Sequence, residues 1–150
     1  MAQSHDEDFV ATQTMIERVI RGLGLDPDKN RQPSTDPRRR AWKIRRGSAS
    51  VYVLLTETDH GSFLQVVSPL LKLPAQEILP LLRRLLEANG GQLYGAAFGL
   101  KGDQVVLSAD RSTVDLDEGE VGAMIKTVGR YADEYDDLLI AEYGGTRQRE

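Results

Sequence analysis

Apolar residues recur at the spacing of an α-helix in three segments of this 150-residue chain, namely residues 9–23, 78–86 and 121–139. Glycines follow the first two segments, as expected at helix ends. Before the third, Asp117 and Glu120 have the spacing of a capping box, in which each side chain binds the other residue's backbone N–H. The pattern therefore predicts three amphipathic helices.

Shorter segments with the character of β-strands lie between these helices. They cover residues 41–46, 50–57, 62–68, 93–100 and 104–109. In the first, alternation places Trp42 and Ile44 inward and Lys43 and Arg45 outward. The second is apolar on both faces, which predicts an interior strand that is covered on both sides.

The order of these elements predicts the fold class. It reads helix, three strands, helix, two strands, helix, or α-β-β-β-α-β-β-α. Because the strands follow one another in hairpins, we expect an α+β fold with a mainly antiparallel five-stranded sheet and three helices. The length fits one domain, which we place at residues 8–142, with a disordered N-terminus at 1–7 and a flexible tail at 143–150. The polar loop at 26–40 holds either a short unrecognised element or a mobile segment.

The helix predicted at residues 77–89 carries apolar side chains over an arc of roughly 160°, whereas a helix lying on one neighbour needs about 100°. A second surface is therefore expected, and a two-fold homodimer would provide one. Pro80 must lie in the first turn, so regular helix should begin near residues 76–78. Asn89-Gly90-Gly91 should end it through a left-handed glycine. The residues assigned to this dimer or partner surface are Ile78, Leu79, Leu82 and Leu86.

The two strands at residues 93–109 form a predicted hairpin around Lys101-Gly102-Asp103. Three small residues, Gly95, Ala97 and Gly99, share one face of its first strand. They indicate either unusually close packing or a bend in the strand. The opposite face carries Tyr94, Ala96, Phe98 and Leu100.

Charge is distributed unevenly along the chain, whose net charge is −4. Residues 31–50 contain seven basic side chains and one acidic side chain. Clustered arginines beside an aromatic ring, here Trp42, can follow a phosphate backbone and stack on a base. Alternatively, the charges protect an edge strand from aggregation and Trp42 belongs to the core. The basic patch consists of Arg38, Arg39, Arg40, Lys43 and Arg45.

The sequence contains no recognisable catalytic, cofactor or metal motif. There are no cysteines, and the two histidines, His5 and His60, cannot form a zinc site by themselves. The glycines match no phosphate-binding loop, and G-x-S-x-G is absent. We therefore expect no enzymatic activity, no cofactor and no metal. A secretory signal and an apolar run of membrane-spanning length are also absent, so we expect a cytoplasmic protein outside the membrane.

One stretch of the sequence resembles a known family. It begins at Leu81-Leu82-Arg83-Arg84-Leu85-Leu86-Glu87-Ala88-Asn89-Gly90 and continues through residues 94–100 to residues 103–107. This succession of helix, asparagine-glycine stop and hairpin resembles the YbjN-type family of bacterial sensory-transduction regulators, which shares its fold with type III secretion chaperones of the Tir-chaperone kind. The resemblance implies a small, non-enzymatic, usually dimeric protein that binds other polypeptides. It implies no particular ligand residues.

Together these observations predict a non-enzymatic domain that binds a protein or peptide client, is chaperone-like or regulatory, and acts as a homodimer. The alternative is a nucleic-acid-binding protein that uses residues 31–46. Its binding should weaken steeply as salt rises, whereas peptide binding to apolar surface should depend weakly on salt.

Overall fold

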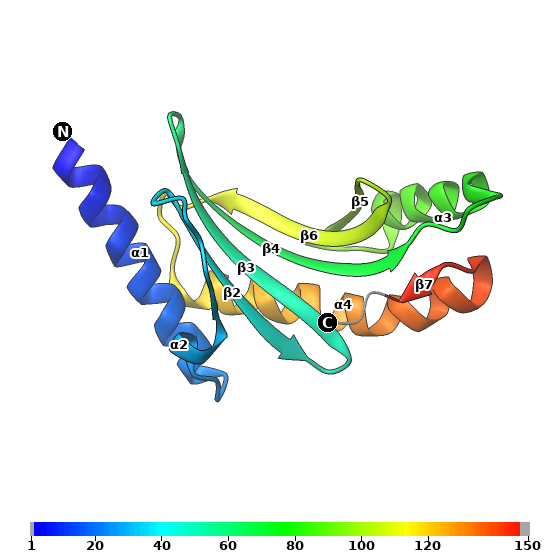
Figure 1. Ribbon diagram of the computed structural model, residues 1–150, viewed down its shortest axis with the longest axis horizontal. Helices are drawn as coiled ribbons and strands as arrows, with labels where there is room; N and C mark the ends of the chain where they lie inside the picture. The colour runs from blue at the N-terminus through cyan, green and yellow to red at the C-terminus, as the bar shows by residue number, and fades with distance from the viewer. Residues whose placement is uncertain (1, 148–150) are drawn as a thin grey trace.

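The computed structural model describes residues 2–147, with side chains from residue 6 onward. Within this range the chain forms four helices and a seven-stranded antiparallel sheet. The helices are α1 (Ala2–Gly22), α2 (Pro27–Asn30), α3 (Ile78–Gly91) and α4 (Glu118–Tyr143). The strands are β1 (Arg31–Gln32), β2 (Arg39–Arg46), β3 (Ala49–Thr58), β4 (Gly61–Lys72), β5 (Ala97–Lys101), β6 (Gln104–Ser112) and β7 (Thr146–Arg147). Figure 1 shows α4 running along one side of the curved sheet, with α1 and α3 toward opposite ends of the molecule.

Hairpins build most of the sheet. β2, β3 and β4 are neighbours in space as they are in sequence. The β5–β6 hairpin follows α3 and joins the other strands through pairing of β6 with β4. The resulting order is β1-β2-β3-β4-β6-β5, and β7 pairs with the C-terminal end of β4. The predicted α+β fold with a mainly antiparallel sheet is confirmed.

The numbers of elements differ from the predicted five strands and three helices. The additional elements are α2, β1 and β7, which are four, two and two residues long. No periodic pattern can develop over so few residues. Two of them, α2 and β1, lie in the loop predicted at 26–40, so the alternative of a short unrecognised element is correct there.

Both predicted chain ends also differ from the structure. The segment predicted as disordered over residues 1–7 is helical from Ala2, and residue 1 lies outside the described residues. The tail predicted as flexible over 143–150 contains the end of α4 and strand β7, while residues 148–150 lie outside the described range. Gly145 permits the pairing of β7 with β4, because a Cβ there would lie 2.7 Å from the carbonyl oxygen of Lys72.

One face of the sheet carries the hydrophobic core. Trp42 and Ile44 are buried there, as predicted, in one cluster with apolar residues of α1, α3 and α4. The prediction that β3 is covered on both sides is wrong for the part of the chain that the structure describes. Its odd-numbered residues from Val51 to Leu55 belong to the core, whereas Tyr52 and Leu54 lie outside it. Periodicity indicates that both faces are apolar, but it does not indicate what covers them.

The strand predicted at residues 93–100 begins only at Ala97. Gly95 has a φ of +78°, which interrupts the extended backbone, so the bend alternative is correct at this position. No close packing occurs at Gly99, where a Cβ would first meet a side-chain atom at 4.0 Å. Because the alternation is broken, the predicted apolar face is only partly buried. Phe98 is buried and Ala96 is half-buried, whereas Tyr94 and Leu100 are exposed.

Candidate functional site

Helix α3 forms from a leucine-rich segment without the usual side-chain cap at its start. Its N-cap, Glu77, has a left-handed backbone (φ +57°) and makes no capping hydrogen bond. Pro80 occupies the third helical position, where its missing N–H removes no helical hydrogen bond, so the predicted helix start is confirmed. The predicted left-handed glycine stop is wrong, because Gly90 and Gly91 remain helical. The helix ends at Gln92, whose backbone N–H donates to the Ala88 carbonyl.

The two sides of α3 differ in their surroundings. Leu81, Leu85 and Ala88 are buried against the core. On another side, Leu79 is 75% exposed and Leu86 is 70% exposed. Leu82 lies between them in sequence and is half-buried, as is Ile78. Positions 82 and 86 follow position 79 by three and seven residues, so the three positions form one line along the helix.

Of the residues assigned to a dimer or partner surface, Leu79 and Leu86 are exposed, whereas Leu82 packs partly against the core. We call Leu79, Leu82 and Leu86 the leucine line. Its charged neighbours Arg83 and Glu87 pair with each other across one helical turn, with Nε and Oε1 2.8 Å apart. Exposing contiguous apolar side chains to water is unfavourable. Such surface on a soluble protein therefore usually marks an interaction site.

Contacts with the β5 strand hold α3 in place and orient the leucine line. The Asn89 side-chain amide donates to the Phe98 carbonyl at 3.0 Å, and its Oδ1 accepts from the Phe98 backbone N–H at 2.7 Å. These bonds satisfy the outer edge of β5 at this residue, which would otherwise be open to pairing with another chain. The Phe98 ring then packs edge-on against Tyr135 of α4, with centroids 5.2 Å apart. The asparagine of the asparagine-glycine stop thus has a structural function.

The residues of the predicted basic patch lie in different surroundings and on both faces of the sheet. Arg38 forms an ion pair with Asp59 at 3.0 Å. Arg40 faces α1, where it donates to Gln13 Oε1 at 3.0 Å and stacks over the Phe9 ring. The other members point to the opposite face of the sheet, because alternate residues of a strand do so. They are Arg39, Lys43 and Arg45.

Trp42 is fully buried and does not accompany these basic side chains. It lies on the core face of β2, while Lys43 and Arg45 lie on the other face. A buried indole cannot stack on a nucleic-acid base. The core interpretation of Trp42 is therefore correct, and Trp42 cannot serve as the aromatic platform of the nucleic-acid alternative.

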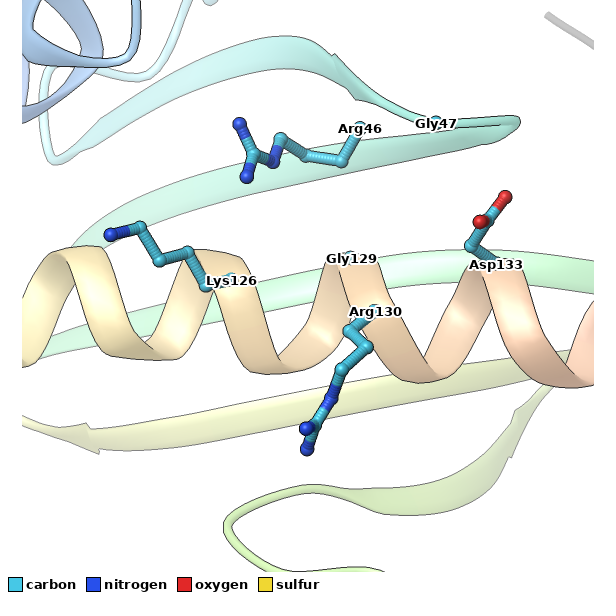
Figure 2. Close-up of a pocket in the computed structure, with 6 residues that line it drawn as sticks. All are labelled: Arg46, Gly47, Lys126, Gly129, Arg130 and Asp133. Atoms are coloured by element: carbon cyan, nitrogen blue, oxygen red, sulfur yellow. The ribbon is translucent and has the colours of Figure 1, made fainter.

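A second feature is the docking of the β2–β3 turn onto α4 (Figure 2). The Ser48 backbone N–H donates to Asp133 Oδ1 at 3.0 Å, and the Ser48 Oγ lies 2.6 Å from the same oxygen. These hydrogen bonds, first the hydroxyl and then the backbone one, hold the pKa of the Asp133 carboxyl below its usual value. The Ser48 Oγ also lies 3.1 Å from Oδ2 of Asp136, which is buried.

The sequence does not predict this contact. The partners are 85 and 88 residues apart in the chain, so no local pattern reports them. The one available signal is glycine at position 129 of an otherwise regular helix. A Cβ there would lie 2.8 Å from Arg46 Cβ, so glycine allows α4 to approach the end of β2.

A shallow depression of about 170 Å³ lies beside this turn, lined by basic and acidic side chains. Figure 2 shows Arg46 and Lys126 extending to the same side, whereas Arg130 points away from them. Arg130 instead lies over the Tyr131 ring, 4.8 Å from its centroid. The cations therefore do not converge on one point, and the depression is not organised as an anion site.

The described residues show no arrangement typical of metal binding or of a membrane span. Among the side chains described between residues 6 and 147, no three of His, Cys, Asp or Glu are grouped so that they could hold a metal ion. None of the helices in this range has both the length and the apolar character that a membrane crossing requires. His60 lies in the β3–β4 turn, where its backbone N–H donates to Thr58 Oγ1.

Comparison with solved structures identifies the fold. A chain in the structure of the ExsC–ExsE complex matches with a TM-score of 0.62 and 16% identity, covering 87% of this chain and 94% of that one. A chain in the structure of the HopA1–SchA chaperone–effector complex matches with a TM-score of 0.54 and 14% identity, covering 86% and 95%. The crystal structure of YbjN from E. coli matches with a TM-score of 0.45 and 14% identity, covering 87% and 89%. The predicted type III secretion chaperone-like fold is confirmed.

Comparison of the sequence with curated proteins found no match. Comparison with family models found one over residues 12–141, which is most of the chain. The match includes α3, the β5–β6 hairpin and nearly all of α4, so it contains the segment on which the resemblance was recognised. The chain belongs to the YbjN family, described as "Putative bacterial sensory transduction regulator".

Proposed function

We propose that this chain is a non-enzymatic protein-binding domain, formed by residues 8–142, that acts as a homodimer in a chaperone-like or regulatory role. The observation that carries the proposal is the leucine line on α3, with two leucines at least 70% exposed on a helix whose other side is fully packed. A two-fold axis beside α3 would bring two such lines together. A cytoplasmic location, expected from the sequence, belongs to the same proposal.

The fold supports a polypeptide as the client. One of the similar structures is a chaperone–effector complex, and this chain covers nearly all of the matched chain in it. Folds host many functions, so this support comes by analogy, whereas the leucine line is a property of this chain. Both point to a protein that recognises other polypeptide chains through apolar surface.

The dimer is tested by Leu86→Asp, which places a charge in the middle of the proposed interface. Burying an unpaired carboxylate between two protomers is costly, so we expect the monomer mass in sedimentation or light scattering. The matched control is Val114→Asp, because Val114 is 71% exposed but lies outside α3. It should leave the mass unchanged. A Leu86→Asp protein that stays folded with the mass of the wild type would remove α3 as the interface.

The client is tested by capture from the native cell lysate with a tagged chain, with and without nuclease. A discrete polypeptide that survives nuclease treatment supports the proposal. Recovery of nucleic acid alone, or of proteins that are lost on nuclease treatment, would instead favour the basic patch and contradict it.

A further inference from the structure

The face of the sheet opposite the core has an apolar centre of its own. Strand register places Lys43, Tyr52, Val67 and Ser108 side by side across β2, β3, β4 and β6, so they share this face. Val67 and Val106 are buried, although neither belongs to the core cluster. We call this surface the open face. The six apolar residues at its centre are Ala41, Tyr52, Leu54, Val67, Pro69 and Val106, and Phe63 and Ala97 lie on the same face of β4 and β5.

No helix of the described chain packs over the open face. The buried apolar residues of α1, α3 and α4 belong to the cluster on the other side of the sheet, and none of the six open-face residues does. A strand such as β3, apolar on both sides, is normally covered on both sides. The expected covering layer is therefore missing from residues 2–147, and a partner can provide it.

A row of positive charge borders the open face along β2. Arg39, Lys43 and Arg45 point to this side, and among the described residues none has an acidic partner. Lys43 lies over the Tyr52 ring instead, 5.7 Å from its centroid. By contrast, Arg38 just before the strand pairs with Asp59. Unpaired cations beside apolar surface suit a ligand that carries the opposite charge.

Asp36 lines a depression together with Arg39. The acidic side chain that the described strands place on the open face is too distant to neutralise Lys43 and Arg45. Asp110 lies on β6, and β3 and β4 separate β6 from β2. Three strand spacings amount to roughly 14 Å. That exceeds the screening length of about 8 Å at physiological salt.

We propose that the open face binds an extended client segment that is apolar at its centre and carries acidic side chains toward β2. The proposal rests on the proposed function and names the client's chemistry and its binding surface. The apolar side chains pack on the six open-face residues, and the carboxylates pair with the row on β2. This surface is distinct from the leucine line, which remains free for the second protomer.

The test uses fluorescently labelled short peptides with a central run of valine and leucine. Three versions carry glutamate, glutamine or lysine on the flanks, and anisotropy measures their affinity. We expect the glutamate peptide to bind most tightly and the lysine peptide least tightly. In the Lys43→Glu/Arg45→Glu double variant this order should reverse. Exposed ion pairs contribute little individually, so replacing two pairs by repulsion should weaken binding of the glutamate peptide about tenfold.

The matched control is Lys126→Glu/Arg130→Glu, which makes the same charge change on α4 and should leave the order unchanged. If the β2 double variant does not fold, Lys43→Gln/Arg45→Gln should still abolish the preference for the glutamate peptide. An unchanged preference, or binding of labelled single-stranded DNA in place of every peptide, would overturn the proposal. So would a change of oligomer mass in the β2 variant, since the open face would then contact a second copy.

The outcomes separate this inference from the proposed function. If the double variant still captures the same polypeptide as the wild type from lysate, the open-face site is wrong and the protein-binding function stands. If neither protein captures a polypeptide and no peptide binds, both are wrong.

Discussion

Helices α3 and α4 pack on the same core but differ in how their N-termini are capped and in how much apolar surface they leave exposed. α4 begins with a complete capping box, Asp117 with Glu120, and its acidic residues are exposed or half-exposed except for Asp136, which is buried. α3 begins at a left-handed glutamate with no side-chain cap and shows leucines both to the core and to solvent. The comparison indicates that α4 packs most of its large apolar side chains within its own chain, whereas α3 retains more apolar surface that the monomer does not use.

The largest expected effect comes from Phe98, which connects the two helices. Its ring packs on Tyr135 of α4 and its backbone is bound by Asn89 of α3. Phe98→Ala removes a buried ring, so the free energy of unfolding should fall by about 3–5 kcal/mol. Chemical denaturation measures this value, and an unchanged unfolding midpoint would show that the helices do not depend on this residue.

Two adjacent leucines of α3 sharpen the comparison between its sides. Leu85 is buried and Leu86 is exposed. Leu85→Ala should lower the free energy of unfolding by about 2–5 kcal/mol. Leu86→Ala should change it by no more than about 0.5 kcal/mol at concentrations where the protein is monomeric. At higher concentration a dimer would add stability that Leu86→Ala reduces, and equal losses at all concentrations would contradict the assignment of the two sides.

Substitutions at the N-caps of the two helices should change the free energy of unfolding by smaller amounts. Asp117 caps α4 through a hydrogen bond from the Glu120 backbone N–H at 2.8 Å, so Asp117→Ala should cost about 1 kcal/mol. Glu77 makes no such bond in α3. Glu77→Ala should therefore leave the free energy of unfolding within about 0.5 kcal/mol of the wild type. Thermal denaturation of the two variants side by side tests this order, and a larger loss for Glu77→Ala would reverse our view of the two helices.

The smallest expected effect is a dependence of stability on pH that arises from Asp133 of α4. Hydrogen bonds from Ser48 lower the folded-state pKa of Asp133, so its ionised form is favoured by folding. This contribution is complete above the unfolded-state pKa of about 3.9 and is lost as pH falls through the lowered folded-state pKa. Because the side chain is exposed, the effect should be small.

Asp133→Asn keeps an acceptor for Ser48 but cannot titrate. Its unfolding free energy should therefore decrease less than that of the wild type on acidification below about pH 4. Identical pH profiles for the two proteins would show that the turn docks without help from the charge of Asp133. α3 carries no comparable contact to a distant turn among the described residues, so variants of α3 should follow the wild-type profile.

Much of the fold was predictable because its elements are long and periodic. The pattern predicted the three long helices, the β2–β3–β4 succession and the burial of Trp42 and Ile44. It also predicted the residues of the leucine line, since a helix arc depends only on local spacing. Elements of two to four residues were missed, as were the helical start of α1 and the pairing of β7, because neither periodicity nor propensity acts over so few polar residues.

The candidate surfaces likewise have features that the sequence predicted and features that it did not. The basic residues were recognised as a group, but register sends Arg40 toward α1 and Arg39, Lys43 and Arg45 to the open face. A strand pattern specifies which residues share a face and leaves open which face meets the core.

The sequence by itself determined the type and order of the main elements and the apolar character of both faces of β3, because these follow from spacings within single segments. Only the tertiary structure decided that no helix of the described residues covers one of those faces, that Ser48 meets Asp133 and Asp136, and that Asn89 binds the edge of β5. These features arise from contacts between segments distant in the chain, whose free energy depends on the packing of the whole molecule.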